Sequence, residues 1–203
     1  MKTVERLTSI LSLAPGYRLF GQLIRGRATE IYVSNYVKPK SGDRLLDIGC
    51  GPGDILNYLP SVDYTGFDIS PEYIAAAEKR FGSRGRFFCG DVGATSQPEE
   101  GGYDIALATG VVHHLDDEVA GRLFRLAMRA LRPEGRLITF DGCYESGQSS
   151  FARWMLDHDR GKFVRTQAEY RKLASATFSR VEESVRNDLL RVPYTHLILS
   201  CRK

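Results

Sequence analysis

Two spacings of apolar residues alternate along the chain. Short apolar runs predict buried strands, and longer stretches with apolar residues at helical spacing predict helices between them. The predicted strands lie near 45–48, 64–68, 86–91, 103–110 and 136–142. The predicted helices lie at 3–13, 16–37, 55–59, 70–81, 117–131 and 166–178. This order predicts an α/β protein whose strands are mostly parallel.

Capping signals set the starts of two of these helices. Ser70 precedes Pro71, an arrangement typical of a helix start. Thr166 and Glu169 have the spacing of a capping box. Beyond the last helix, the pattern over 180–203 predicts two strands that pair antiparallel.

The segment 44–55, RLLDIGCGPGDI, carries the most informative motif. Asp47 interrupts the apolar run near its end, and three glycines then follow at alternate positions. Glycine permits positive φ and lets a ligand approach the main chain closely. A strand, a tight turn and a helix start in this order predict a ligand site beyond the carboxyl end of the strand.

The glycine spacing narrows the class of ligand. Gly49, Gly51 and Gly53 form G-x-G-x-G, not the dinucleotide pattern G-x-G-x-x-G, and Asp54 follows directly. A carboxylate there would repel a phosphate, and no Lys-Ser or Lys-Thr follows as in a P-loop. The turn therefore suits a nucleoside with little negative charge, such as S-adenosylmethionine. A tight turn in another kind of α/β protein is the alternative interpretation.

Asp68 adds a second acidic group to this motif. It ends the second predicted strand, about 20 residues beyond the glycines, where an acid can accept both ribose hydroxyls of a nucleoside. The alternative, an acid that caps the next helix, is weaker because Ser70 is better placed for that role.

These motifs together resemble a known family. LLDIGCGPG resembles the first motif of class I S-adenosylmethionine-dependent methyltransferases, and HHLDD and LRPEGRL are similar to patterns of the small-molecule "type 11" branch. The resemblance implies a Rossmann-like three-layer sandwich with a seven-stranded, mostly parallel sheet, strand order 3-2-1-4-5-7-6 and an antiparallel last strand. It implies one methyltransferase domain over 1–203, with an N-terminal helical lid over 1–40 and an acceptor-site insertion over 142–166.

The resemblance also implies which residues bind the cofactor S-adenosylmethionine. Asp91 would accept the adenine amino group, and the amide of Val92 would meet the ring nitrogen next to it. The alternative is that Asp91 is only a turn residue and contacts no ligand. The full implied set is Asp47, Gly49, Cys50, Gly51, Gly53, Asp68, Ile69, Asp91, Val92, Thr109 and Gly110.

The paired histidines follow the fourth strand, where the family places methyl transfer. Two adjacent side chains cannot share one helical face, so we expect one of His113 and His114 to point inward and serve as the base, with His113 favoured. Packing or capping is the alternative. A metal site formed with Asp116 and Asp117 fits no standard zinc spacing, and we predict no metal.

Acceptor residues are expected in the N-terminal helices, in the insertion and near the last hairpin. The candidates are Tyr17, Phe20, Tyr144, Arg160 and Tyr194. Arg160, Lys162 and Arg165 are candidate cations for a carboxylate or phosphate of the acceptor, and a solvated basic loop is the alternative. Asp141, Arg191 and His196 are weaker candidates, Asp141 because it also ends a strand.

Composition and charge set broader limits. Residues 1–119 carry 12 Lys and Arg against 16 Asp and Glu, whereas residues 120–203 carry 16 against 9. The basic half is either a solvated face or the side that meets an anionic acceptor or partner. The four cysteines are far apart and are expected to be buried thiols of a cytoplasmic protein. No secretory signal or membrane span is expected.

The sequence thus predicts methyl transfer to an O or N atom of a small metabolite, with an anionic metabolite as one option. An RNA or protein methyltransferase, a nicotinamide oxidoreductase and a non-catalytic cofactor-binding protein are the alternatives. Nucleic acid is disfavoured as a partner because the Asn-Pro-Pro-aromatic type of signature of amino-methyltransferases is absent. The oligomeric state is predicted only as monomer or homodimer.

Overall fold

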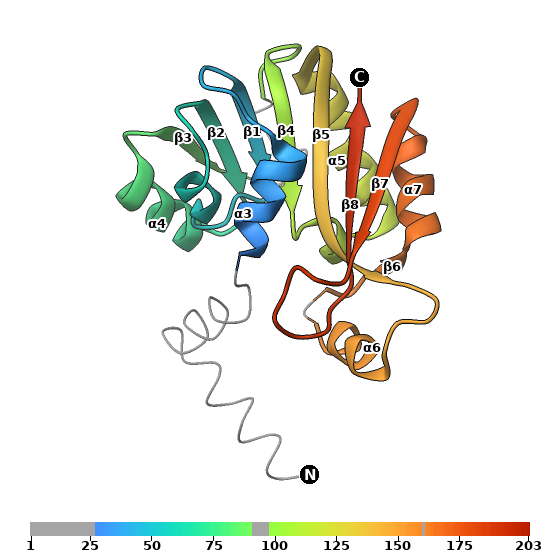
Figure 1. Cartoon of the computed structure of the whole chain (residues 1–203). Coiled ribbons are helices and arrows are strands. Elements are labelled where there is room, and N and C mark those ends of the chain that lie inside the picture. The colour runs from blue at the N-terminus through green and yellow to red at the C-terminus, as the bar shows by residue number, and fades with distance from the viewer. Residues whose placement is uncertain (1–26, 91–97, 160) are drawn as a thin grey trace.

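The computed structural model describes residues 27–90, 98–159 and 161–203. Its centre is a sheet with the strand order β3-β2-β1-β4-β5-β8-β7 (Figure 1). The strands are β1 Arg44–Ile48, β2 Asp63–Asp68, β3 Gly85–Cys89, β4 Tyr103–Thr109, β5 Leu131–Tyr144, β6 Arg165–Thr166, β7 Arg180–Arg186 and β8 His196–Arg202. β8 runs antiparallel to β5 and β7, and the other pairs are parallel.

Helices cover both faces of this sheet. They are α3 Ala28–Tyr32, η1 Val33–Val37, η2 Asp54–Asn57, α4 Pro71–Phe81, η3 Val112–His114, α5 Asp117–Ala130, α6 Ser150–Asp157 and α7 Gln167–Ser175. Residues of α3, η1, η2 and α4 form one buried cluster with one face of the sheet, and residues of α5 and α7 form a second cluster with the other face. The three-layer prediction is therefore confirmed.

The predicted strand order is also confirmed, with β7 and β8 as the sixth and seventh strands of the prediction. β6 is an additional two-residue strand that pairs with Cys143 and Tyr144 at the end of β5. Its two residues are too few to produce an apolar pattern, so no spacing in the sequence predicts it.

Local capping chemistry behaves as the sequence indicates. The Ser70 side chain accepts a hydrogen bond of 3.2 Å from the amide of Tyr73 at the start of α4. Thr166 and Glu169 form both halves of the capping box at α7. These interactions stabilise the two helices where loops leave the sheet.

Several predicted elements differ in the structure. The expected helix at 55–59 is a single 3-10 turn, η2, because Pro60 follows closely and leaves no room for a further turn. The insertion over 142–166, for which no helix or strand is predicted before Thr166, contains α6 and β6. The helix at 3–13 and the first half of that at 16–37 lie outside the described residues, and the second half of the latter contains α3 and η1.

Three of the four cysteines are buried, but Cys89 is exposed, so the expectation of four buried thiols was wrong there. Cys89 ends β3, which lies at the edge of the sheet and has only one neighbouring strand. Among the helices of the described residues, none is long and apolar enough to cross a membrane.

Candidate functional site

The glycine turn joins β1 to the start of η2 in a left-handed backbone. Gly49, Gly51 and Gly53 have φ of 76°, 53° and 72°. The amide of Gly49 donates to the Phe67 carbonyl at 2.7 Å, which fixes the turn against β2. A Cβ at Gly49 would lie 2.5 Å from Val111 Cγ2, so glycine is required there for space as well as for φ.

Asp68 connects the glycine turn to the start of α4. Its Oδ2 accepts from the Gly51 amide at 2.8 Å, and its Oδ1 accepts from the Ser70 amide at 2.9 Å. Each carboxylate oxygen keeps a further lone pair for a ligand. The carboxylate is thus held in a fixed orientation at the tip of β2.

Asp47 is the second acid at this edge, and only 3% of it is exposed. Its Oδ2 accepts a 2.6 Å hydrogen bond from the Tyr64 hydroxyl, whereas its Oδ1 is buried without a partner. Burial raises the pKa of Asp47 to about 7. The hydrogen bond from Tyr64 lowers this pKa in part, and the negative charge of Asp68 raises it slightly. A buried carboxylate oxygen without a donor is the kind of atom that a cationic or N–H ligand group satisfies.

Apolar surface lies beside the turn. Ile69 is 71% exposed directly after Asp68, and the exposed Phe88 stacks on Phe67 with ring centroids 5.2 Å apart. Asp91 and Val92, the expected adenine contacts, lie outside the described residues.

The end of β4 faces the glycine turn. Gly110 has φ of 71°, and its amide donates to the Phe140 carbonyl on β5 at 2.7 Å. The Thr109 hydroxyl lies 3.4 Å from the hydroxyl of Tyr32, a buried side chain of α3. The turn after β4 therefore approaches both the first strand and the N-terminal layer.

His113 is the inward-pointing histidine. It is buried, whereas the neighbouring His114 is exposed, as the sequence predicted for one of the pair. Asp141, at the end of β5, lies with its Oδ1 2.8 Å from His113 Nδ1 and accepts from the His113 amide at 3.2 Å. The carboxylate therefore fixes both the ring and the turn that carries it.

Two glycines approach the His113 ring. A Cβ at Gly110 would lie 3.8 Å from Cε1, and a Cβ at Gly161 would lie 2.1 Å from Cδ2 and 3.0 Å from Cγ. The ring therefore packs between the turn after β4 and the loop that carries Gly161. The Phe163 amide donates to the His113 carbonyl at 2.9 Å and holds the covering loop in place.

Electrostatics favour the charged form of His113. Burial lowers its pKa, but the hydrogen bond and charge of Asp141, with the charge of Asp159, outweigh that effect and raise the pKa above its ordinary value. Asp141 Oδ2 is itself buried without a hydrogen-bond partner. A buried carboxylate bonded to Nδ1 stabilises an imidazolium, which is what a general base becomes after it accepts a proton.

A second buried histidine lies on the neighbouring strand. The ring of His196 stacks on Phe140 at 4.5 Å and lies 4.6 Å from the Tyr194 ring, whose hydroxyl donates to Asp159. Burial is the main cause that lowers the pKa of His196 to about 4, so its ring is neutral near pH 7. Its Nδ1 has no hydrogen-bond partner. Tyr194 and His196, both predicted acceptor residues, thus lie side by side.

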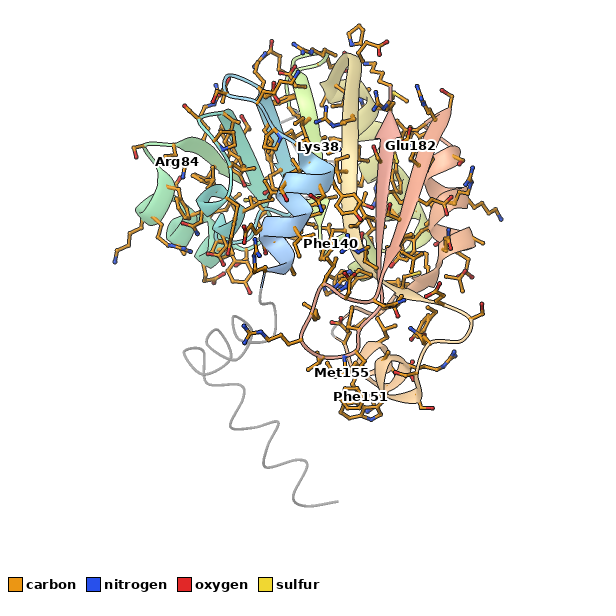
Figure 2. All side chains as sticks on the ribbon, in the orientation of Figure 1. Lys38, Arg84, Phe140, Phe151, Met155 and Glu182 are labelled. Atoms are coloured by element: carbon orange, nitrogen blue, oxygen red, sulfur yellow. The ribbon has the colours of Figure 1, made fainter. Side chains whose placement is uncertain are left out.

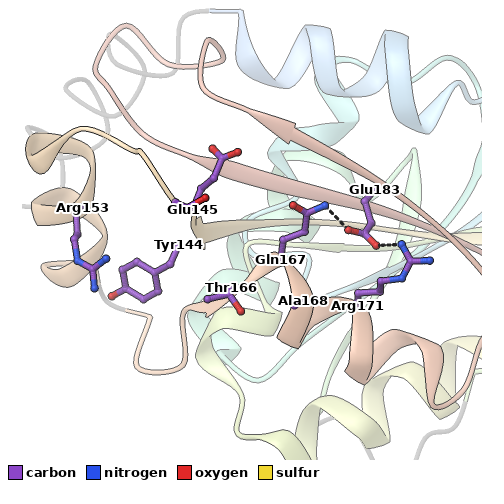
Figure 3. Close-up of a pocket in the computed structure, with 9 residues that line it drawn as sticks. Tyr144, Glu145, Arg153, Thr166, Gln167, Ala168, Arg171 and Glu183 are labelled. Atoms are coloured by element: carbon purple, nitrogen blue, oxygen red, sulfur yellow. Dashed lines mark hydrogen bonds and ion pairs between the residues drawn. The ribbon is translucent and has the colours of Figure 1, made fainter.

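Tyr144 lies apart from this cluster, in an open cavity of about 590 Å³ (Figure 3). Its hydroxyl donates to Asp157 at 2.7 Å, and the Arg153 guanidinium lies 5.2 Å from its ring centre. Glu183, on the far side of the cavity, pairs with Arg171. The structure therefore places Tyr144 and Tyr194 in different surroundings.

Arg165 was wrongly predicted as a cation for the acceptor. It is buried, and its guanidinium pairs with Asp117 and donates to the carbonyls of Val112, Leu115 and Phe163. This arginine therefore supports the turn that carries His113. Its neighbours in sequence give no sign of that role, because Asp117 and the carbonyls of Val112 and Leu115 lie 48 to 53 residues away.

The other expected acceptor residues have varied placements. Lys162 and Arg191 are exposed, and Tyr17, Phe20 and Arg160 lie outside the described residues. Within 27–90, 98–159 and 161–203, no group of three His, Cys, Asp or Glu side chains is arranged to hold a metal ion. Asp159 was not singled out from the sequence, where nothing distinguishes it from Asp157.

Comparisons with known proteins agree with this geometry. A family model described as a methyltransferase domain matches residues 45–135. A Mycobacterium tuberculosis protein described as a methyltransferase is 41% identical over 92 residues, which are 43% of this chain and 46% of that protein. The 27-O-demethylrifamycin SV methyltransferase of Amycolatopsis mediterranei is 33% identical over 110 residues, 50% of this chain and 39% of that enzyme.

A solved structure shows the same fold over almost the whole chain. The Haemonchus contortus phosphoethanolamine N-methyltransferase 2, in complex with phosphomonomethylethanolamine and S-adenosylhomocysteine, has a TM-score of 0.72 at 16% identity. The alignment covers 97% of this chain and 59% of that one. Residues 45–135, just under half of the chain, thus match a methyltransferase domain, and the solved structure shares the fold of nearly the whole chain. It spans less than half the length of the two sequence relatives.

Proposed function

We propose that this protein transfers a methyl group from S-adenosylmethionine to an oxygen or nitrogen atom of a small molecule. The proposal rests on two groups of residues that lie at the same edge of the sheet. One is the glycine turn with Asp47 and Asp68, and the other is the pair His113 and Asp141. Val111, which is two residues before His113 in the chain, lies against Gly49 of the glycine turn.

The described residues fit the cofactor. Asp68, fixed by two amides, would accept from the ribose hydroxyls, and the exposed side chain of Ile69 would cover the adenine. The partnerless Oδ1 of Asp47 would face a positively charged part of the methionine moiety. Gly49, Cys50, Gly51, Gly53, Thr109 and Gly110 would line the backbone cradle. Asp91 and Val92 stay predicted adenine contacts.

When bound, S-adenosylmethionine supplies a methyl carbon made electrophilic by its sulfonium. The protein's part is then to orient the acceptor, which contributes ~7–11 kcal/mol when the reacting atoms are well aligned. For a hydroxyl acceptor, His113 Nε2 would take the proton and Asp141 would stabilise the resulting imidazolium. For an amine, the same nitrogen would keep the acceptor neutral.

The names of the relatives support acceptors of this size. The name of one relative refers to methylation of a rifamycin at an oxygen, and the name of the structural neighbour refers to methylation of phosphoethanolamine at its nitrogen. Tyr194 and His196 beside Asp159 are the described side chains we assign to the acceptor, and Tyr17 and Phe20 stay predictions. An anionic acceptor would depend on Arg160 and Lys162, because Arg165 is already paired within the fold.

Turnover measurements test the proposal. S-adenosylhomocysteine formation is measured with a panel of small alcohols, phenols and amines for the wild type, His113→Gln and His114→Gln. We expect His113→Gln to lower kcat by ~10²–10⁴ for a hydroxyl acceptor, with His114→Gln near wild type. Because the pKa of His113 is raised, wild-type kcat should increase with pH through a value above the usual 6.5. Unchanged turnover in His113→Gln would remove the base role.

The alternatives give different outcomes in the same assays. Salt-sensitive tRNA binding with methyl incorporation into RNA would make the chain an RNA enzyme. Incorporation into polypeptide would make it a protein methyltransferase. Cofactor binding without turnover on any acceptor class would leave a non-catalytic binding protein.

A further inference from the structure

His196 is a buried imidazole whose Nδ1 has no hydrogen-bond partner among the described residues. Only 6% of the residue is exposed. Phe140 stacks on the imidazole ring at 4.5 Å, and the ring of Tyr194 lies 4.6 Å from it. Phe140, which Figure 2 labels on β5, also contacts the ring of Tyr32 on α3 at 5.0 Å. A polar atom is thus enclosed by aromatic surface.

The neighbouring rings give this nitrogen no partner. The hydroxyl of Tyr194, the polar group of the adjacent ring, donates to Asp159 instead. A buried polar atom without a partner costs stability, and a phenylalanine would fill the same space without that cost. A buried water needs about two to four polar partners, which the faces of these rings do not supply. A ligand group therefore explains the imidazole better than packing does.

The backbone that carries His196 is fixed before any ligand arrives. The Cys143 amide donates to the Thr195 carbonyl at 3.0 Å, and the Thr195 hydroxyl accepts from the Gln148 side chain at 2.8 Å. His196 itself begins β8 and pairs with Gly142 of β5. A side chain that is held in place in this way loses little freedom when it binds a ligand, which favours selective binding.

His196 also lies near the point at which we expect methyl transfer. Its partner in the strand register, Gly142, directly follows Asp141, whose carboxylate holds His113. Burial lowers the pKa of His196 most, Asp159 raises it and His113 lowers it further, so both charges lie within range of the ring. A small acceptor whose reacting atom meets His113 can therefore place a second group against His196.

The chemistry of His196 favours a hydroxyl as that second group. With a pKa of about 4, the ring is neutral near pH 7. A neutral imidazole nitrogen donates or accepts according to the tautomer, and a hydroxyl matches both forms. A carboxylate would face a neutral ring and the negative charge of Asp159. An ammonium group brings three donors, of which Nδ1 accepts at most one.

We propose that His196 determines acceptor specificity by binding, through Nδ1, a hydroxyl group other than the atom that receives the methyl group. The acceptor is then an uncharged molecule with a hydroxyl near the methylated atom, and not the anionic metabolite that the sequence left as an option. Because this acceptor is the one in the proposed methyl transfer, the inference rests on that function. His196 acts on binding and takes no part in proton transfer.

Matched acceptors test this specificity in the wild type. Four phenols share one phenolic hydroxyl and differ in a second group: 4-(2-hydroxyethyl)phenol has a hydroxyl, 4-ethylphenol has none, tyramine has an ammonium and 4-hydroxyphenylacetate has a carboxylate. S-adenosylhomocysteine formation gives kcat/KM for each. We expect the hydroxyl compound to exceed 4-ethylphenol by about 10–100-fold, mostly through KM, and the two charged compounds by more. For any other acceptor found in the turnover assay, the four corresponding analogues replace these phenols.

Substitutions connect the preference to His196. In His196→Phe, the ratio of kcat/KM between the hydroxyl compound and 4-ethylphenol should fall to near one. His196→Gln keeps a neutral donor and acceptor and should restore part of the ratio. His158→Gln is the matched control, because His158 is an exposed histidine directly after α6, and it should retain the wild-type ratio. The wild-type comparison stays decisive if His196→Phe does not fold.

The outcomes separate this specificity from the proposed function. Equal kcat/KM for the hydroxyl compound and 4-ethylphenol, or a preference for either charged compound, would overturn the role of His196 and leave methyl transfer in place. A hydroxyl preference that persists in folded His196→Phe would have the same consequence. If no acceptor yields S-adenosylhomocysteine although calorimetry shows cofactor binding, the proposed function is refuted, and the role of His196 falls with it.

Discussion

Lowering the pH from 8 to 6 is expected to weaken cofactor binding by about tenfold, because Asp47 must lose a proton to bind a cation. Its carboxyl is buried, and its pKa is about 7. The cofactor carries positive charge in its methionine moiety. If that charge meets Asp47 Oδ1, which has no other partner, the bound state favours the carboxylate.

The size of the effect follows from this pKa. With a pKa of about 7, Asp47 in the free protein is about 90% protonated at pH 6 and about 10% at pH 8. If the bound state holds only the carboxylate, the affinity ratio between these pH values is about ten, or ~1.4 kcal/mol. The sign is fixed: cofactor binding releases a proton and strengthens as pH rises.

Isothermal titration calorimetry with S-adenosylhomocysteine at pH 6, 7 and 8 measures this ratio. Asp47→Asn keeps an acceptor for the Tyr64 hydroxyl but cannot ionise, so its affinity should be lower and nearly independent of pH. Asp104→Asn is the matched control, since Asp104 is also a buried acid and accepts from the Arg44 amide at the other end of the sheet. A wild-type affinity that is flat between pH 6 and 8 would refute the role of Asp47.

Three further predictions concern the supports of the site. Gly49→Ala should abolish cofactor binding, because the added carbon meets Val111 and the φ of 76° is unfavourable for alanine; calorimetry checks this. Arg165→Met should lower the free energy of unfolding by about 1–3 kcal/mol in urea titrations, since it strands buried carbonyls. Burial lowers the pKa of His196 to about 4, so the folded protein should lose stability as pH falls from about 6.5 toward 4. Between pH 6.5 and 4.5, the free energy of unfolding of His196→Phe should fall by about 2–3 kcal/mol less than that of the wild type.

The cofactor side was readable from the sequence because its signals are local. The apolar run before Asp47, the alternate glycines and the acid at the second strand tip all act within 25 residues of one another. Positive φ and close packing restrict a turn to glycine, so sequence and geometry correspond directly there.

The acceptor side was less readable because its partners are far apart in sequence. Arg165 resembles any loop arginine until Asp117 and the carbonyls around His113 surround it. Likewise, Asp141 gained a role only when β5 brought it beside His113, 28 residues away. Such long-range contacts leave no periodic pattern behind.

The helix α6 illustrates the same limit. Its eight residues are too few for an apolar period to be distinguished from a loop, and its outward aromatic side chains obscure the amphipathic pattern. The family resemblance implied only that this insertion as a whole belongs to the acceptor site, since loops at strand ends usually carry specificity.

A calorimetric titration decides whether the sheet edge that carries Asp47 and Asp68 binds an adenosyl ligand. S-adenosylhomocysteine and NADH are each titrated calorimetrically into the full chain. We expect one S-adenosylhomocysteine site per chain, strongly weakened in Asp68→Ala, and no heat with NADH. Tight NADH binding without any response to S-adenosylhomocysteine or S-adenosylmethionine would contradict it.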